Sequence, residues 1–252
     1  MRILPADLTY RYDGSWPGFL CCVFESVYSS QLPFAILPFD EPSLTLFEER
    51  PIPTDREKAR RVERSLPARL GFGAREAAMH AFLYGLPGKE LAILRFLLLG
   101  YRQGPRVMQM LGHADVAPVL EMEKHVRGEA HLLAGFLRFA DYGEFLGASI
   151  SPKHYVLPLL RAHFCQRYPE ENFIIYDKSH AAALLYQDHK ASYAQLAQPP
   201  RFPAESQAEQ RFQALWKNFY NTVAIEARKN PALRRTHCPK RYWVNMTELR
   251  PE

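Results

Sequence analysis

The sequence predicts an α+β protein that is mostly helical and has a small antiparallel sheet. Apolar residues recur at helical spacing through most of residues 74–142. After Gly143 the pattern changes to short β-prone runs separated by one helical stretch. The 252 residues are 47% hydrophobic and 23% charged, an ordinary globular composition that excludes disordered and collagen-like chains.

The N-terminal segment begins with a short strand over residues 8–12, which ends in the turn residues Asp13-Gly14-Ser15. Ser15 is the predicted N-cap of the next helix, because its hydroxyl can accept a hydrogen bond from a backbone amide of the first turn. Apolar side chains recur at helical spacing in that helix: Phe19, Leu20, Val23, Phe24 and Val27.

Two extended segments, residues 34–40 and 44–49, come next, and prolines 33, 38 and 42 mark their edges or bends. A charged helix follows from about residue 54 to residue 66. Thr54 and Glu57 stand three residues apart, which predicts a capping box at the start of this helix.

The expected order after the helices of residues 74–142 is a strand over 144–150, a helix over 153–168 and a strand over 172–177. Residues 180–186 and 192–197 are expected to form a hairpin, and proline-rich residues 198–203 a linker. A helix over 204–229 and a basic tail complete the chain. The sequence favours a single domain over 1–252, with a sub-division near 143 and a basic C-terminal segment over 201–252.

The excess positive charge is concentrated in the C-terminal segment. Residues 201–252 carry ten Lys or Arg against five acids, whereas residues 1–200 balance at 22 against 22. Residues 228–241 hold six of these cations and no acid. Such a distribution is typical of a surface that binds a polyanion; the alternative is a solvated helix end that attracts cations.

Several function classes lack their sequence signals. The longest apolar run, residues 91–99, is interrupted by Arg95 and is too short to span a membrane, and no signal peptide opens the chain. The four cysteines form no Cys-x-x-Cys pair, which disfavours zinc ribbons, iron–sulfur clusters and thioredoxin chemistry. No common nucleotide-binding, hydrolase or metalloprotease motif occurs. We therefore expect a cytoplasmic, reduced protein and assign no cofactor or metal.

One scattered set of polar residues lies on the predicted helix around residue 125. Glu121, His125 and Glu129 are spaced four residues apart and share a helix face, so they could hold a divalent metal or relay a proton. His131 lies off that face, and Arg138 follows the helix. The alternative is an exposed, charged surface.

A second set surrounds a predicted strand end. His163 and Arg167 stand one helical turn apart, and Asp177 ends the strand three residues before His180. A carboxylate facing such a pair can orient a proton carrier or help to grip a phosphate. The alternative is that Asp177 makes the turn, and Asp13 likewise is either a turn residue or a site residue.

The tail offers the most informative stretch, in which cations alternate with large aromatic residues. Lys and Arg neutralise phosphates, and an exposed Tyr or Trp can stack on a base. The expected nucleic-acid-binding residues are Arg234, Arg235, Lys240, Arg241, Tyr242 and Trp243. Trp243 is alternatively an anchor that docks the tail on the core.

The stretch from Tyr12 to Glu25, YDGSWPGFLCCVFE, resembles the opening motif of a bacterial family described as DNA-metabolism or DNA-repair proteins. Three later blocks resemble the same family. The first contains EAH (residues 129–131) and GFLRF (135–139). The second contains ISP (150–152), HF (163–164), RY (167–168) and IYD (175–177), and the third contains PKRYW (239–243) followed by Glu248. The resemblance covers about residues 10–248. Trp16 and His180 depart from it, since a Phe and a basic Arg or Lys often stand there.

The resemblance implies a nucleic-acid role and a protein partner. Members of this family are encoded beside a radical-SAM protein, or carry a fused uracil-DNA-glycosylase-like domain. We therefore expect a DNA-repair or DNA-modification accessory protein that binds single-stranded or damaged DNA and acts with a radical-SAM or glycosylase-like protein, away from membranes.

The rival hypotheses are an enzyme that acts on a nucleobase or phosphodiester, and a scaffold for another protein. In the enzyme hypothesis Asp177 or Glu129 is the general base and His163 or His131 the acid. The candidate catalytic residues are Asp13, His131, Arg138, His163, Arg167 and Asp177. The accessory-protein hypothesis expects all of them except Asp13 to line a polar cleft that takes a flipped base or a phosphate.

Overall fold

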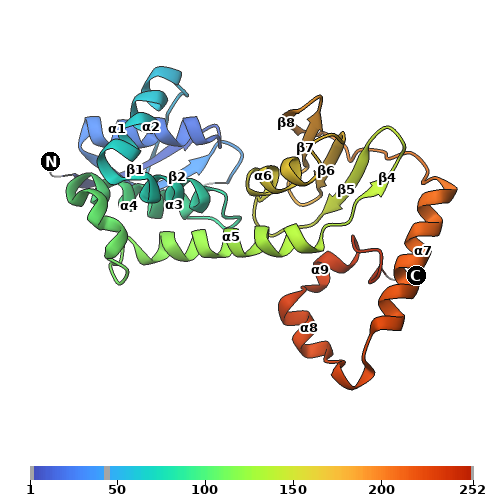
Figure 1. The fold of residues 1–252 in the computed structure, drawn as a ribbon. Coiled ribbons are helices and arrows are strands. Elements are labelled where there is room, and N and C mark those ends of the chain that lie inside the picture. The colour runs from blue at the N-terminus through green and yellow to red at the C-terminus, as the bar shows by residue number, and fades with distance from the viewer. Residues whose placement is uncertain (1–2, 43–45, 251–252) are drawn as a thin grey trace. The chain divides into compact units, whose positions relative to one another are not determined.

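The computed structural model describes residues 3–42 and 46–250 and divides into two compact units, Met1–Val126 and Arg127–Glu252 (Figure 1). The division falls inside helix α5 (Ala117–Phe136), whereas the change of sequence pattern lies near Gly143. Helices outweigh strands in the described residues, so the predicted α+β class is confirmed.

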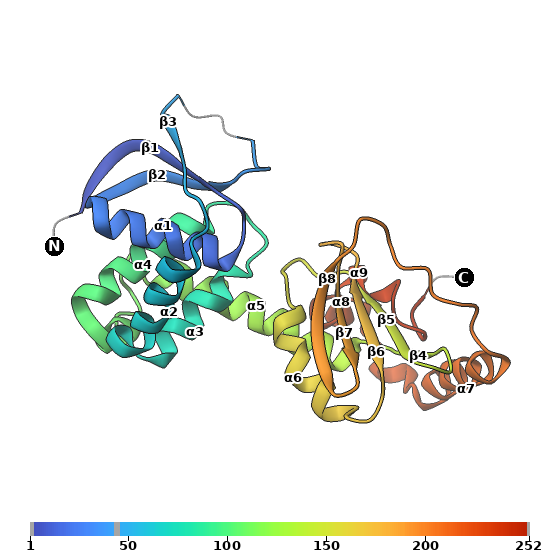
Figure 2. The same cartoon turned by 90° about the horizontal axis from the view of Figure 1, so that it is seen from above.

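The first unit contains a three-stranded sheet in the order β2-β1-β3. Its strands are β1 (Leu4–Tyr12), β2 (Gln31–Pro38) and β3 (Glu48–Pro51), and β1 pairs with both neighbours in parallel. A parallel pair needs a crossover connection, and α1 (Trp16–Ser29) supplies it between β1 and β2 (Figure 2). The extended segment expected over 44–49 lies partly outside the described residues, since 43–45 are not described.

The side chains of Ser15 and Asp55 cap the N-termini of the first two helices. The Ser15 hydroxyl accepts a hydrogen bond from the Gly18 amide at 3.0 Å, which confirms Ser15 as the N-cap of α1. The capping box predicted at Thr54 is wrong. Asp55 caps α2 (Arg56–Leu70) by accepting from the Glu57 and Lys58 amides, and the Thr54 hydroxyl instead donates to Asp13 at 2.7 Å.

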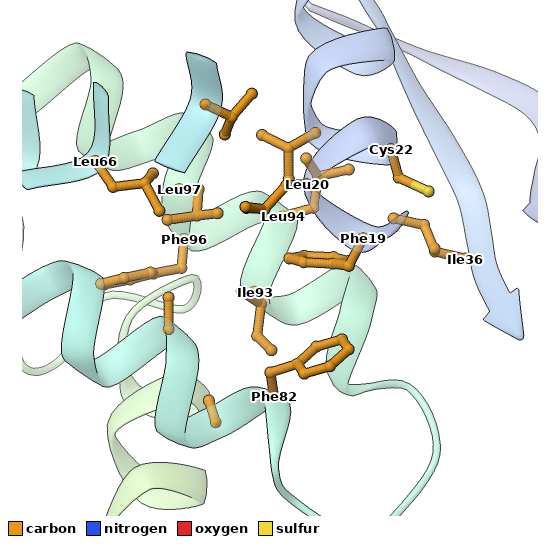
Figure 3. Packing of buried hydrophobic residues seen from close by; sticks show 14 of the residues in the cluster. Phe19, Leu20, Cys22, Ile36, Leu66, Phe82, Ile93, Leu94, Phe96 and Leu97 are labelled. Atoms are coloured by element: carbon orange, nitrogen blue, oxygen red, sulfur yellow. The ribbon is translucent and has the colours of Figure 1, made fainter. Parts of the chain in front are cut away.

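The core of the first unit forms where α1 and α4 (Lys89–Gln103) pack on β2, with α2 and α3 (Phe72–Phe82) beside them. Phe19, Ile93 and Leu94 lie close together there, and all three side chains are buried (Figure 3). A 3₁₀ helix, η1 (Gly104–Gln109), follows α4 and packs against it.

The second unit contains a five-stranded sheet in the order β4-β5-β6-β7-β8. Its strands are β4 (Ala140–Asp141), β5 (Leu146–Ile150), β6 (Phe173–Asp177), β7 (Ala182–Gln187) and β8 (Lys190–Gln195). Only the β5–β6 pair is parallel, and α6 (Leu157–Arg167) makes that crossover and packs on β7. The predicted β7–β8 hairpin is confirmed.

The chain ends in α7 (Gln207–Val223), a 3₁₀ turn η2 (Glu226–Arg228), α8 (Pro231–His237) and α9 (Lys240–Trp243). Ser206 caps α7 by accepting from the Glu209 amide at 3.1 Å. This helix stops well before residue 229, the expected end. Within the described ranges, no helix is long and apolar enough to cross a bilayer.

Candidate functional site

A cavity of about 580 Å³ lies in the second unit, bounded by the end of α5, the segment that follows it, α6, α7 and Thr247. Its lining combines cationic groups with aromatic rings. The cationic and imidazole side chains are Arg138, His163 and Arg167, and the rings are Phe139, Phe164, Tyr168, Phe212 and Trp216. Three of the six predicted catalytic residues are therefore brought to one cavity.

Helix α6 contributes His163, Phe164 and Arg167 to the lining of this cavity. Phe164 is buried and packs edge-on against Phe139 at 5.5 Å between ring centroids. His163 and Arg167 are exposed beside it. The Arg167 guanidinium lies over the Tyr168 ring, 5.6 Å from its centroid. Since α6 contains no acidic residue, these two side chains can face an anion without an acid of their own helix competing for it.

Arg138 is held in a fixed position at the edge of the cavity. Its Nη2 donates to Glu248 Oε1 at 2.8 Å, its Nη1 donates to the Gly135 carbonyl at 2.9 Å, and its guanidinium lies over the Trp216 ring at 5.7 Å. Trp216 Nε1 donates to the other oxygen of Glu248 at 3.1 Å. Burial raises the pKa of Glu248, but these hydrogen bonds outweigh it and lower the pKa, so the carboxylate stays charged.

One acid, Glu209, also lines the cavity. Its Oε2 accepts from the Asp141 amide at 3.2 Å, and its Oε1 accepts from Gln213 Nε2 at 2.8 Å. The cavity thus offers a carboxylate and an amide near its aromatic wall.

The other predicted catalytic residues do not line the cavity. His131 is exposed on α5. Asp177 is fully buried, and its carboxylate accepts from the Ser179 and His180 amides and lies 2.7 Å from His180 Nδ1, so it closes the turn after β6. Asp13 belongs to the first unit.

Asp13 makes a turn like that of Asp177. Its carboxylate accepts from the Ser15 amide and hydroxyl and from the Thr54 hydroxyl. Burial raises the pKa of Asp13, but these hydrogen bonds outweigh it and lower the pKa below its usual value. The turn interpretation therefore accounts for the contacts of both aspartates.

Glu129, proposed from sequence as a metal ligand or base, is instead a buried anchor. It accepts hydrogen bonds from the Lys153 and His154 amides, from Arg241 Nη2 at 2.6 Å and from the Tyr242 hydroxyl at 2.7 Å. Burial raises its pKa, but these donors outweigh burial and lower it. Glu121 and His125 are exposed, and the described residues contain no group of three metal-ligating side chains.

The tail residues predicted to bind nucleic acid divide into two sets. Tyr242 is buried and donates to Glu129, and Arg241 pairs with the same carboxylate, so these two residues hold the tail on α5. Trp243 Nε1 donates to the Cys238 carbonyl at 2.9 Å, a contact within the tail. Arg235 and Lys240 are exposed and Arg234 is half-buried.

Sequence reasoning missed the contribution of α7 to the site. Phe212 and Trp216 stand four residues apart on that helix and line the cavity. Their spacing on an amphipathic helix was an available signal, but it did not indicate which surface of the unit they would line.

The chain was compared with protein families, curated proteins and solved structures. A family model described as a domain of unknown function, DUF4130, matches residues 87–248. No curated protein and no solved structure matches the chain.

Proposed function

The chain belongs to the family of the domain of unknown function DUF4130, and on that premise we propose that it is a nucleic-acid-binding accessory protein of DNA repair or DNA modification. The observation that carries the proposal is the cavity of the second unit, in which Arg138, His163 and Arg167 meet a wall of aromatic rings. A volume of about 580 Å³ lies in the range of small-ligand sites and suits one nucleotide.

Each part of a nucleotide has a matching group in the cavity. Phe212, which is 68% exposed, offers a face on which an unstacked base can lie. The Trp216 ring beside it already packs against Arg138 and Phe219. Arg167 and His163 are exposed for a phosphate, since neither is engaged in an ion pair among the described residues. Glu209 and its neighbour Gln213 can accept from or donate to the edge of the base. A base reaches such a cavity only from a single strand or after it is extruded from a duplex.

Exposed cations of the tail would add contacts to a nucleic-acid backbone. Arg235 and Lys240 are open to solvent, and Arg234 is half-buried. Phosphate contacts of this kind position the polymer and make its affinity depend on salt.

An enzyme that acts on a nucleobase or phosphodiester is the rival function, and the geometry favours binding over it. The two carboxylates that the enzyme hypothesis named as bases are engaged elsewhere, Glu129 with Arg241 and Asp177 with His180. A catalytic version would have to use Glu209 and His163, the acid and imidazole that line the cavity. Turnover of uracil-containing or alkylated DNA that His163→Ala abolishes would favour that version.

The protein partner comes from the family resemblance. We propose that the chain acts in the cytoplasm with a radical-SAM protein. Co-expression of the two proteins followed by size-exclusion chromatography tests this, and separate elution of the two at micromolar concentration would contradict it.

Two arginines of α6 allow a matched test of the cavity. Arg167 lines the cavity, whereas Arg161 is exposed on the same helix outside the lining. We expect Arg167→Gln to weaken binding of a fluorescent single-stranded oligonucleotide about tenfold, as the loss of a charge-assisted contact does. Arg161→Gln removes the same charge and should change the affinity by less than about twofold.

Fluorescence anisotropy across a salt series is the measurement. Equal losses in the two variants would mean that only the net charge matters and would contradict the role of the cavity. Phe212→Ala is an independent check, because it removes a largely exposed ring of the cavity wall without removing charge.

A further inference from the structure

Helix α2 carries a strong local excess of positive charge on the first unit. Its 15 residues include six Lys or Arg and two acids. The apolar residues Ala59, Val62, Leu66 and Leu70 are buried and recur at helical spacing. The six cations are all exposed: Arg56, Lys58, Arg60, Arg61, Arg64 and Arg69.

The acids on α2 do little to neutralise this face. Glu63 accepts from Arg75 Nε at 2.7 Å and from Trp16 Nε1 at 2.9 Å, so its charge is already paired with another helix. Glu57 is the remaining acid on the helix. It lines a shallow groove of about 570 Å³ together with Arg60, Arg61, Arg64 and Ser65.

Aromatic rings of α1 lie beside these cations. Lys58 Nζ and the Arg61 guanidinium lie over the Phe24 ring, 5.4 Å and 5.9 Å from its centroid. The Tyr28 ring is nearly parallel to that of Phe24, at 6.0 Å and 10°. Tyr28 is 80% exposed, so its outer face is open to a planar ligand.

We propose that this basic–aromatic surface (Phe24, Tyr28, Lys58, Arg60, Arg61 and Arg64) binds a single strand of nucleic acid. The cations would follow the phosphates along α2, and a base would stack on Tyr28. Stacking needs the exposed face of a base, which a single strand offers and an intact duplex does not. An acidic protein would satisfy the cations but would leave the tyrosine unused.

The choice of nucleic acid as the ligand rests on the proposed function, but the residues of this surface are different from those of the cavity. All six lie in the first unit and precede the residues matched by the family model. The two proposals can therefore fail separately.

The test compares variants of the full chain in binding to a fluorescent oligodeoxythymidylate across a salt series. Lys58→Gln, Arg61→Gln and Arg64→Gln together should lower the salt slope by about two, since each phosphate contact on a single strand contributes about 0.7. The control removes the same charge from exposed Arg95, Arg102 and Arg106 of the same unit and should leave the slope nearly unchanged.

Tyr28→Ala tests the stacking step. It should lower the affinity about five- to a hundredfold without changing the salt slope, because the lost contact carries no charge. Phe72→Ala is the control, since Phe72 is 76% exposed on the same unit. Circular dichroism confirms that each variant is folded.

The outcomes separate the two proposals. Equal effects of the α2 and control variants, or full affinity in Tyr28→Ala, would overturn the role of this surface. Loss of binding only in the cavity variant Arg167→Gln would overturn it too and leave the proposed function standing. Loss only in the α2 and Tyr28 variants would support the surface and contradict the cavity. Equal binding of duplex and single strand would overturn the preference for a single strand.

Discussion

The carboxylate of Glu129 accepts a 2.7 Å hydrogen bond from the hydroxyl of Tyr242, which lies 113 residues further along the chain. The same carboxylate pairs with Arg241 and with the backbone amides of Lys153 and His154. One buried anion therefore joins α5, the loop before α6 and the tail.

Replacing Glu129 by Gln should loosen the tail. Gln keeps an acceptor but loses the charge that balances Arg241. Because the Arg241 side chain is 44% exposed, water offsets part of the loss, and we expect the free energy of unfolding to fall by about 1–3 kcal/mol. Urea denaturation measures this loss, and limited proteolysis should cut the tail of the variant first. An unchanged urea midpoint with a protected tail would contradict the anchor.

The same contact predicts a pH dependence. The folded pKa of Glu129 lies below its usual value, so its contribution to stability is complete above the unfolded pKa of about 4.3. That contribution is lost as the pH falls through the lower folded pKa. Urea midpoints measured from pH 7 to about pH 3 should therefore fall less steeply in Glu129→Gln than in the natural chain, and parallel curves would argue against it.

The adjacent cations Lys240 and Arg241 should behave differently. Arg241→Ala should lower stability, because it leaves a buried carboxylate without its ion pair. Lys240 is exposed, so Lys240→Ala should leave the urea midpoint unchanged and lower the salt slope of oligonucleotide binding by about 0.7 to 0.9. Identical stabilities of the two variants would contradict this division of the tail.

Two helical glycines should respond oppositely to a methyl group. A Cβ at Gly18 would overlap the Asp13 carboxylate and come within 2.9 Å of the Thr54 hydroxyl. Gly18→Ala should therefore cost about 1–3 kcal/mol. Nothing lies within 4 Å of a Cβ at Gly128 in α5, so Gly128→Ala should stabilise by up to about 1 kcal/mol. Thermal melts of the two variants measure these changes in stability. A Gly18→Ala variant as stable as the natural chain would mean that the turn at Asp13 can move.

Asp177 should matter for stability and not for binding. Asp177→Ala leaves the amides of Ser179 and His180 without their acceptor, at a cost of about 1–3 kcal/mol. Asp177→Asn keeps that acceptor and should recover part of the loss. Both variants should bind oligonucleotide with natural affinity below their melting temperature. A folded Asp177→Asn that has lost turnover or binding would instead support a catalytic role.

The sequence predicted those structural features that depend on residues close together in the chain. Ser15 caps α1 as expected, and the turn between β7 and β8 joins strands that are neighbours in sequence. The parallel sheet of the first unit was not anticipated, because β1 pairs with strands that follow a helix and a long connection. Thr54 and Asp55 are adjacent, and either residue type can cap α2. The Thr54 hydroxyl is engaged with Asp13, which is distant in sequence, and Asp55 is the cap.

The site was predictable in part for the same reason. His163 and Arg167 share a face of one helix, so their proximity follows from helical spacing. Tyr242 reads as an exposed stacking residue in sequence, since a four-residue helix shows no periodicity that would indicate its buried face. Its direction is set by Glu129, far away in the chain, and no local pattern carries that information.

The contacts of Glu129 and Glu248 also set an order of assembly during synthesis. Helices α5 and α6 are synthesised before the tail. Glu129 therefore cannot form its contacts with Arg241 and Tyr242, nor Arg138 its contact with Glu248, until the tail has been synthesised. The cavity is therefore finished only when the last residues of this segment emerge. A nascent or prematurely terminated chain would carry the helices of the site without the charge pairs that fix them.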